Sequence, residues 1–300
     1  MTTPLAAPTL SDRIQTSLNA PVDPAVRGLA AHLGEAAGAL AVLFYGSNLR
    51  TGSLEGVLDF YVLLPGGIET GIWPRVSYHE RDRDSVTLRA KVATMTLATF
   101  AAAASGKTLD TTIWARFVQP SALAWVQDRA QADAVGEAVE AAAITASRYA
   151  IALGPPAGTA EDYWRALFRA TYRAEFRVEK PGRENDILGV NQAHFAGLLP
   201  AALADAGIVW TRDGAILHPQ LGIAERDALR RGWARRARLG KPYNLVRLLR
   251  ASTTFDGAAK YAAWKIERHT GVPVTLTPWR ERHPVLAAPG VLWRVWRARR

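Results

Sequence analysis

The chain of 300 residues contains no cysteine. This absence excludes disulfide bonds, cysteine-ligated metal centres and thiolate nucleophiles, and it agrees with a reducing cytoplasm. The sequence also lacks an apolar run of the roughly 20 residues that a membrane-spanning helix needs. The longest uncharged stretch in its middle, residues 92–106, lies between Lys91 and Lys107. The first residues lack the basic and then apolar order of a secretory signal, so we expect an ordinary frayed start.

The motifs of several enzyme classes are missing as well. The sequence has no Gly-x-Ser-x-Gly elbow and no Walker motif, so hydrolase and P-loop functions have no support. Its six His show no metal-ligand spacing. Of these, only His79 lies near the residues considered below, and a structural role for it is the simpler interpretation.

The apolar content is high enough for a large core. Hydrophobic residues make up 49% of the chain and include ten Trp, so most of it is expected to fold. The net charge of +10 is unevenly placed. Residues 225–300 hold 18 Lys and Arg against 5 Asp and Glu, whereas the remaining 224 hold 19 against 22. This charge asymmetry is typical of a protein that binds a polyanion, either nucleic acid or an anionic membrane. A basic face exposed to solvent has the same pattern.

Local patterns predict an α/β unit followed by helices. Apolar runs at 41–45 and 57–64 predict strands, and β-branched residues favour further strands within 85–99 and 112–118. Asp23 and Pro24 favour a helix start. Further helices are expected at 11–18, 24–40, 121–152, 159–178 and 243–269, with breaks at 155–158 and 240–242. The chain therefore divides into residues 1–120, 121–240 and 241–300.

The segment from Leu43 to Leu63 has the most informative order of residues. A strand leads into Gly46 and Ser47, and a second strand then presents Asp59 among apolar residues. Glycine permits close approach of the backbone to a triphosphate, and Ser47 with the amides that follow it can bind phosphate oxygens. A carboxylate within an apolar strand is costly unless a cation or donors accompany it. This order resembles the nucleotidyltransferase fold, in which such an Asp holds Mg²⁺ against the nucleotide.

Most nucleotidyltransferases carry a second carboxylate two residues further on, where this chain has Tyr61. A metal site would have to recruit another carboxylate, and the segment 78–84 offers Glu80, Asp82 and Asp84. Arg89 and Lys91 are two residues apart in a predicted strand, so they share a face. Beside Asp59 they would suit a triphosphate, although an exposed edge strand shows the same pattern.

Patches of the sequence resemble the mitochondrial-type phosphatidate cytidylyltransferases, the soluble CDP-diacylglycerol synthases also described as translocator assembly and maintenance proteins. That family carries Tyr-Gly-Ser followed by a single Asp in an apolar strand. The patches keep the family's order and include a segment that ends in a basic residue before Pro120. They lie at 43–63, 71–79, 88–94, 109–120, 172–177, 245–250 and 258–260. Asn48 and Glu175 depart from the family's Gly and Asp, and nothing beyond Gly271 has a counterpart.

The resemblance implies an α+β protein: a nucleotidyltransferase-fold α/β domain, a mainly helical domain and a basic C-terminal tail. It implies a phosphatidate cytidylyltransferase that moves CMP from CTP to phosphatidate, with Mg²⁺ as cofactor. The implied catalytic residues are Asp59, Ser47 and Lys260, and the implied metal ligands are Asp59, Glu80 and Asp84. Nucleotide binding would fall to Gly46, Ser47, Tyr78, Arg89, Lys91 and Arg177.

The composition of the C-terminal segment favours an anionic membrane over nucleic acid as the polyanionic partner. Residues 291–300 combine two Trp with four Arg, as a peripheral anchor does, although a helix that docks its Trp on its own domain fits too. We therefore expect a cytoplasmic protein associated peripherally with the inner face of an anionic membrane and without a stable nucleic-acid partner. Two alternatives stay open: a nucleotidyltransferase for another acceptor, and an inactive member of the fold that binds nucleic acid. The sequence leaves the oligomeric state open.

Overall fold

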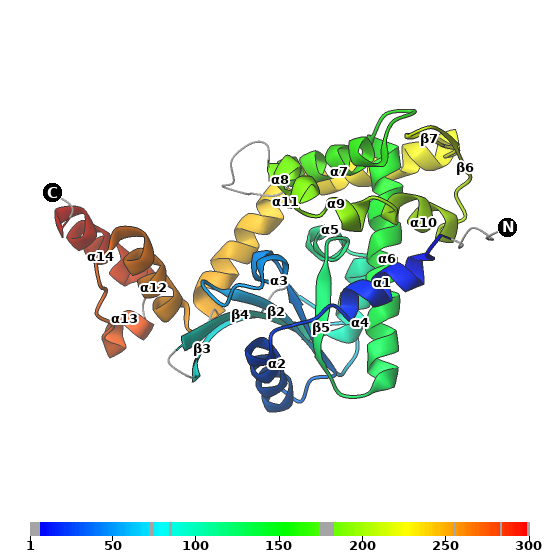
Figure 1. The fold of residues 1–300 in the computed structure, drawn as a ribbon. Helices are drawn as coiled ribbons and strands as arrows, with labels where there is room; N and C mark the ends of the chain where they lie inside the picture. The colour runs from blue at the N-terminus through cyan, green and yellow to red at the C-terminus, as the bar shows by residue number, and fades with distance from the viewer. Residues whose placement is uncertain are drawn as a thin grey trace.

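A computed structural model describes residues 7–71, 75–83, 86–174, 183–254, 256–282 and 284–298. Its centre is a five-stranded sheet in the order β3-β4-β2-β1-β5 (Figure 1). The pair β2–β4 is parallel, and the other three pairs are antiparallel. The strands are β1 (Ala41–Tyr45), β2 (Leu58–Leu64), β3 (Arg75–Arg83), β4 (Val86–Thr96) and β5 (Ser121–Val126).

The two faces of the sheet are buried by different helices. Alternation along β2 turns Phe60 and Val62 toward α2 (Pro24–Ala36), and it turns Tyr61 and Leu63 to the opposite face. That second face is covered by three helices, α4 (Leu97–Ala104), α5 (Thr112–Phe117) and α6 (Arg129–Leu153). Asp59 is two residues before Tyr61, so it belongs to the second face.

Capping residues explain where the first helices begin. Thr9 and Asp12 form a reciprocal capping box at the start of α1 (Leu10–Leu18), and Asp23 accepts a hydrogen bond from the Ala25 amide at the start of α2. Between the first two strands lies the short helix α3 (Ser47–Thr51).

The second half of the chain is helical and shares the core of the sheet. Buried Trp164, Phe168 and Leu199 belong to the same apolar cluster as Leu43 and Tyr61. The elements of this half are α7 (Ala160–Ala174), α8 (Arg183–Val190), α9 (Gln192–Phe195), α10 (Leu198–Asp205), β6 (Trp210–Asp213), β7 (Ile216–Pro219) and α11 (Ile223–Thr254).

The C-terminal helices are α12 (Ala258–Thr270), α13 (Pro278–Arg282) and α14 (Pro284–Ala298). They form a lobe beside the β3 edge of the sheet (Figure 1). The lobe is attached through α12, because the Tyr78 amide donates to the Asp256 carbonyl oxygen at 2.8 Å just before this helix.

The expected α+β fold with a helical C-terminal part is confirmed. Three local predictions are wrong. Residues 112–117 form a helix rather than a strand, and Asp110 just before it accepts hydrogen bonds from the amide and hydroxyl of Thr112 in its first turn. Residues 121–126 form a strand paired with β1, so the sheet continues past residue 120. The break expected at 240–242 does not occur, since α11 continues through Pro242.

Within the described ranges, no single helix has both the length and the apolar composition to cross a membrane. One pair of segments, Glu184–Val190 and Gln192–Asp205, meets that test only when taken together, and the pair is bent by 85°.

Two glycines of α11 give a matched test of how closely this helix packs. A Cβ on Gly240 would lie 2.4 Å from the Ala174 carbonyl oxygen, whereas a Cβ on Gly232 would lie 3.4 Å or more from its neighbours. We expect Gly240→Ala to lower the free energy of unfolding by about 1–3 kcal/mol, as overpacking does. Gly232→Ala should leave it unchanged or raise it by up to about 1 kcal/mol, through helix propensity. Urea unfolding of both variants checks this. Equal stabilities would contradict the close packing of Gly240 against the Ala174 backbone.

Candidate functional site

Asp59 is the centre of the candidate site. The register aligns it with Tyr45 on one side and with Lys91 on the other. Its carboxylate makes no hydrogen bond and no ion pair with any residue that the structure describes. Burial raises the pKa of Asp59, and the positive charges of Lys91 and Arg116 partly offset this. An oxygen ligand is therefore present to which no described residue donates a hydrogen bond.

Gly46 lies directly beside this carboxylate. Gly46 has a φ of 94°, and a Cβ added to it would lie 3.3 Å from Asp59 Oδ2. Glycine is thus required for its backbone angle and favoured by the close approach. Ser47 follows at the exposed start of α3. Asn48 closes the loop behind it, since its amide nitrogen donates to the carbonyl oxygens of Ser53 and Glu55 at 2.8 and 2.7 Å.

Two cations flank Asp59. Lys91 is aligned with it on the neighbouring strand, and burial lowers the pKa of Lys91 while the charge of Asp59 raises it. The second cation is Arg116 at the end of α5. Its guanidinium donates to Tyr61 Oη at 2.6 Å and lies over the rings of Tyr45 and Tyr61, at 5.1 and 5.6 Å from their centroids.

Tyr61 therefore has a different role from the carboxylate usual at its position. It is completely buried, and burial raises its pKa, so it stays a neutral phenol that holds Arg116. In place of a second negative charge, the chain positions a positive charge near Asp59.

The expected metal ligands do not come together. Glu80 lies on β3, two strands and about 10 Å from Asp59. Its Oε1 accepts a hydrogen bond from Tyr78 Oη at 2.8 Å and pairs with Arg89 Nε at 3.3 Å. Asp84 and Arg177 lie outside the described residues. Among those that are described, no group of three His, Cys, Asp or Glu could hold a metal ion.

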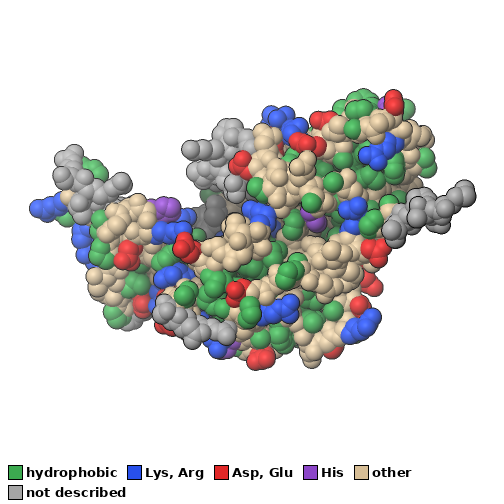
Figure 2. All heavy atoms as spheres, in the orientation of Figure 1, with side chains coloured by type: hydrophobic (Ala, Val, Ile, Leu, Met, Phe, Trp, Pro, Cys, Tyr) green, Lys and Arg blue, Asp and Glu red, His purple; other side chains and the backbone are tan. Residues whose placement is uncertain are grey.

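Helix α12 covers the β3–β4 side of the site. Tyr261 packs on Tyr78 with ring centroids 5.4 Å apart, and Arg89 lies over the Trp264 ring at 5.4 Å. Lys265 is close enough to lower the pKa of Lys91. Lys260, expected to be catalytic, is exposed on this helix, and its neighbour Tyr261 makes the contact instead. Figure 2 shows further Lys and Arg side chains over the lobe of the C-terminal helices.

Sequence reasoning grouped Gly46, Ser47, Asp59 and Lys91. The structure places Gly46 and Lys91 beside Asp59, whereas the Ser47 hydroxyl donates to Asn48 Oδ1 at 3.3 Å. Sequence reasoning missed Arg116 and Lys265. Arg116 is the basic residue of the segment before Pro120, which the family resemblance pointed to without naming the residue. No local pattern identifies Lys265, because only the packing of α12 on the sheet brings it close.

A scan against models of known protein families and a search of curated proteins both find no match to this chain.

The raised pKa of Asp59 predicts how stability depends on pH. The folded chain keeps this carboxyl protonated to higher pH than the unfolded chain does. The free energy of unfolding therefore falls as the pH rises from the unfolded-state pKa to the folded-state pKa. Asp59→Asn removes that loss of stability. We expect it to melt a few degrees above the wild type at neutral pH, and the two should converge below the ordinary carboxyl pKa of about 3.9. Thermal unfolding against pH checks this, with exposed Asp205→Asn as control. A variant less stable than the wild type at neutral pH would contradict it.

Proposed function

We propose that the protein is a nucleotidyltransferase that moves CMP from CTP to phosphatidate and releases pyrophosphate. The observation that carries this proposal is the Asp59 carboxylate, which has no described partner, lies against Gly46 and is flanked by Lys91 and Arg116. The mixed sheet with Gly-Ser after its first strand and an Asp in its second supports a nucleotidyltransferase fold.

The cations supply most of the charge compensation for a triphosphate. Helix α3 has five residues, too short to contribute much from its dipole. Lys91 and Arg116 approach Asp59 from a strand and a helix, with Lys265 further out on α12. Fixed positive charges stabilise the negative charge that develops as phosphates transfer, and they need no reorganisation during the reaction.

The residues also fit a Mg²⁺ ion carried in by the nucleotide. Mg²⁺ is commonly held by one or two carboxylates together with substrate phosphates and waters. Asp59 is the protein ligand in this arrangement, and the Gly46 backbone lies next to it. Bound there, the ion would neutralise phosphate charge. Glu80 already contacts Tyr78 and Arg89. We therefore propose that Asp59 is the single protein carboxylate that binds the ion.

The transfer is a substitution at the α-phosphorus of CTP. An oxygen of the phosphatidate phosphate forms the new bond to this phosphorus, and the bond to the bridging oxygen of the β-phosphate breaks. Pyrophosphate leaves with that electron pair, and CDP-diacylglycerol is the product. The attacking phosphate is already ionised near neutral pH, so positioning and charge neutralisation are the main tasks of the protein.

The C-terminal lobe supports a lipid acceptor. Trp279, Trp293 and Trp296 are each at least half exposed on α13 and α14, and Arg297 lies over the Trp293 ring at 5.4 Å. Aromatic and basic side chains together are typical of peripheral attachment to an anionic membrane, which we propose on its cytoplasmic face.

One observation favours an alternative: an inactive member of the fold that binds nucleic acid through its basic lobe. Tyr61 occupies the position of a second catalytic carboxylate and is sealed in the core. The assay below separates the two functions.

Labelled CTP, Mg²⁺ and phosphatidate vesicles, followed by lipid extraction, test the transfer directly. We expect labelled CDP-diacylglycerol from the wild type and a loss of at least about 100-fold with Asp59→Asn, the size of effect seen for residues that stabilise the transition state. Asp82→Asn alters an exposed carboxylate on β3 and should retain activity. Equal activity of Asp59→Asn and wild type would remove Asp59 from the mechanism.

Truncation after Gly290 tests the membrane attachment. It removes two Trp and four Arg, so binding to phosphatidate vesicles should weaken by up to about 4 kcal/mol, at about 1 kcal/mol per basic residue. Raised salt should reproduce much of the loss. Vesicle co-sedimentation, beside filter binding to RNA and DNA, measures both partners. Tight nucleic-acid binding with no preference for phosphatidate over neutral vesicles would contradict the lipid function.

A further inference from the structure

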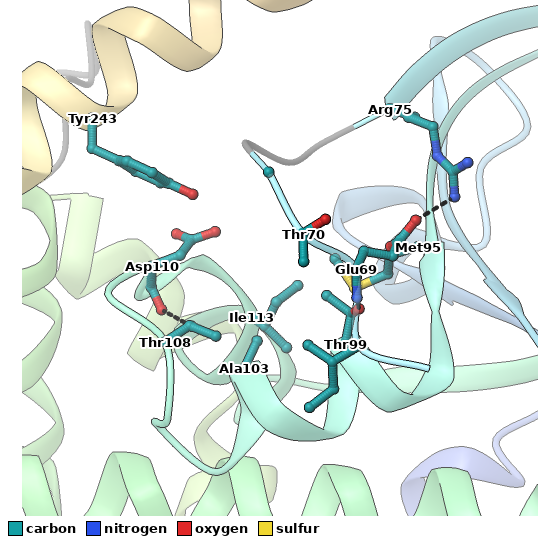
Figure 3. Close-up of a pocket in the computed structure, with 12 residues that line it drawn as sticks. Glu69, Thr70, Arg75, Met95, Thr99, Ala103, Thr108, Asp110, Ile113 and Tyr243 are labelled. Carbon is teal, nitrogen blue, oxygen red and sulfur yellow. Dashed lines mark hydrogen bonds and ion pairs between the residues drawn. The ribbon is translucent and has the colours of Figure 1, made fainter. Parts of the chain in front are cut away.

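A separate cavity of about 310 Å³ lies between the end of β4, helix α5 and helix α11 (Figure 3). Its apolar wall consists of Ile68, Met95, Ala103 and Ile113. The volume is near the lower end of the range for small-molecule sites, about 300–1,000 Å³. It suits one small ring system rather than a large ligand.

The cavity and the site around Asp59 share two elements, strand β4 and helix α5. On β4, Met95 of the cavity and Lys91 are four residues apart, so they share a face at a separation of about 13 Å. On α5, Ile113 of the cavity and Arg116 are three residues apart and lie on one side of the helix. A ligand with phosphates at Lys91 and Arg116 would have to span about 13 Å to place its other end in the cavity.

Asp110 provides a polar group of fixed orientation in the cavity wall. Its Oδ1 accepts from the Thr112 amide at 2.9 Å, from Thr112 Oγ1 at 2.6 Å and from Arg247 Nη1 at 3.1 Å. Within the described part of the chain, all the hydrogen bonds to this carboxylate go to Oδ1. Oδ2 is therefore left to accept a hydrogen bond from a ligand.

Tyr243 supplies an aromatic ring beside Asp110. It reaches from α11 toward the cavity, with its hydroxyl on the side of the Asp110 carboxylate (Figure 3). Arg247 lies over this ring at 5.9 Å, which fixes its orientation. An aromatic ring beside an apolar wall is suited to stacking on a planar ring.

We propose that this cavity binds the base of the nucleotide, with Tyr243 against the ring and Asp110 Oδ2 accepting from an exocyclic amine, as in cytosine. A carboxylate is the usual protein acceptor for the cytosine amine. Uracil would turn a carbonyl oxygen toward the same carboxylate, so the cavity discriminates between the two pyrimidines. The inference rests on the proposed function, because that function places the phosphates at Lys91 and Arg116.

Calorimetric binding of CTP, UTP and inorganic tripolyphosphate to the full chain tests this base site. We expect the wild type to prefer CTP over UTP by about tenfold, the lower part of the range for such hydrogen-bond discrimination. Asp110→Asn keeps an oxygen for Thr112 and offers an amide donor, so it should abolish or invert this preference. Tyr243→Ala should weaken both nucleotides by about tenfold, and Tyr243→Phe should restore most of that affinity. Tripolyphosphate has no base, and its binding should respond only to Lys91→Ala.

The results separate failure of the base site from failure of the function. If tripolyphosphate binds and Lys91→Ala weakens it, while Tyr243→Ala leaves CTP and UTP at wild-type affinity, the base lies elsewhere and this inference is wrong. If the wild type binds neither CTP nor tripolyphosphate, the proposed function itself is wrong. Thermal unfolding of each variant confirms folding. If Asp110→Asn fails to fold, the comparison of Tyr243→Ala with Tyr243→Phe decides whether the base binds in this cavity.

Discussion

The rest of the site depends on a carboxylate that the fold holds inside the sheet without a hydrogen-bond donor. Burial of such a group is unfavourable, and the raised pKa of Asp59 expresses that cost. Lys91 and Arg116 offset it through their charge, yet neither forms an ion pair with Asp59 in the described structure. Asp59 is therefore not neutralised by an ion pair within the described structure, as a closed salt bridge would do. Such a buried carboxylate with a raised pKa lowers the stability of the fold, and groups of this kind are typical of functional sites.

Tyr61 and Arg116 change how charge is balanced beside that carboxylate. A second carboxylate on the same strand face would need a second cation to neutralise it. Here a buried phenol holds a guanidinium at 2.6 Å, and the Tyr45 ring supports its flat face. Arginine stays charged at every physiological pH and donates in a fixed plane, so it is suited to phosphate oxygens. The Arg116 side chain thus supplies part of the positive charge that metal ions supply in a site with two carboxylates.

The sequence was sufficient wherever neighbouring residues determine the structure. Asp23 caps α2, the apolar runs at 41–45 and 57–64 contain β1 and β2, and Gly46 meets Asp59 because those strands pair directly. It was insufficient where distant segments decide. Residues 112–117 are β-branched and aromatic enough for a strand, but they form a helix that packs into the shared core and is tied to α11 by the Asp110–Arg247 ion pair. Lys265 reaches the site only because α12 packs on β3, a contact that local patterns cannot predict.

Helix α5 shows why the two halves of the chain work as one unit. A helix of six residues is not stable alone, so its place must come from its contacts. Trp114 and Phe117 fix its buried side in the shared core, and Asp110 at its start pairs with Arg247 of α11 at 3.1 Å, with both side chains almost buried. Breaking a pair buried to this degree leaves an uncompensated charge. The position of Arg116 at the other end of α5 therefore depends on α11, which lies more than one hundred residues further along the chain. The charge next to Asp59 is set by the helical half as much as by the sheet.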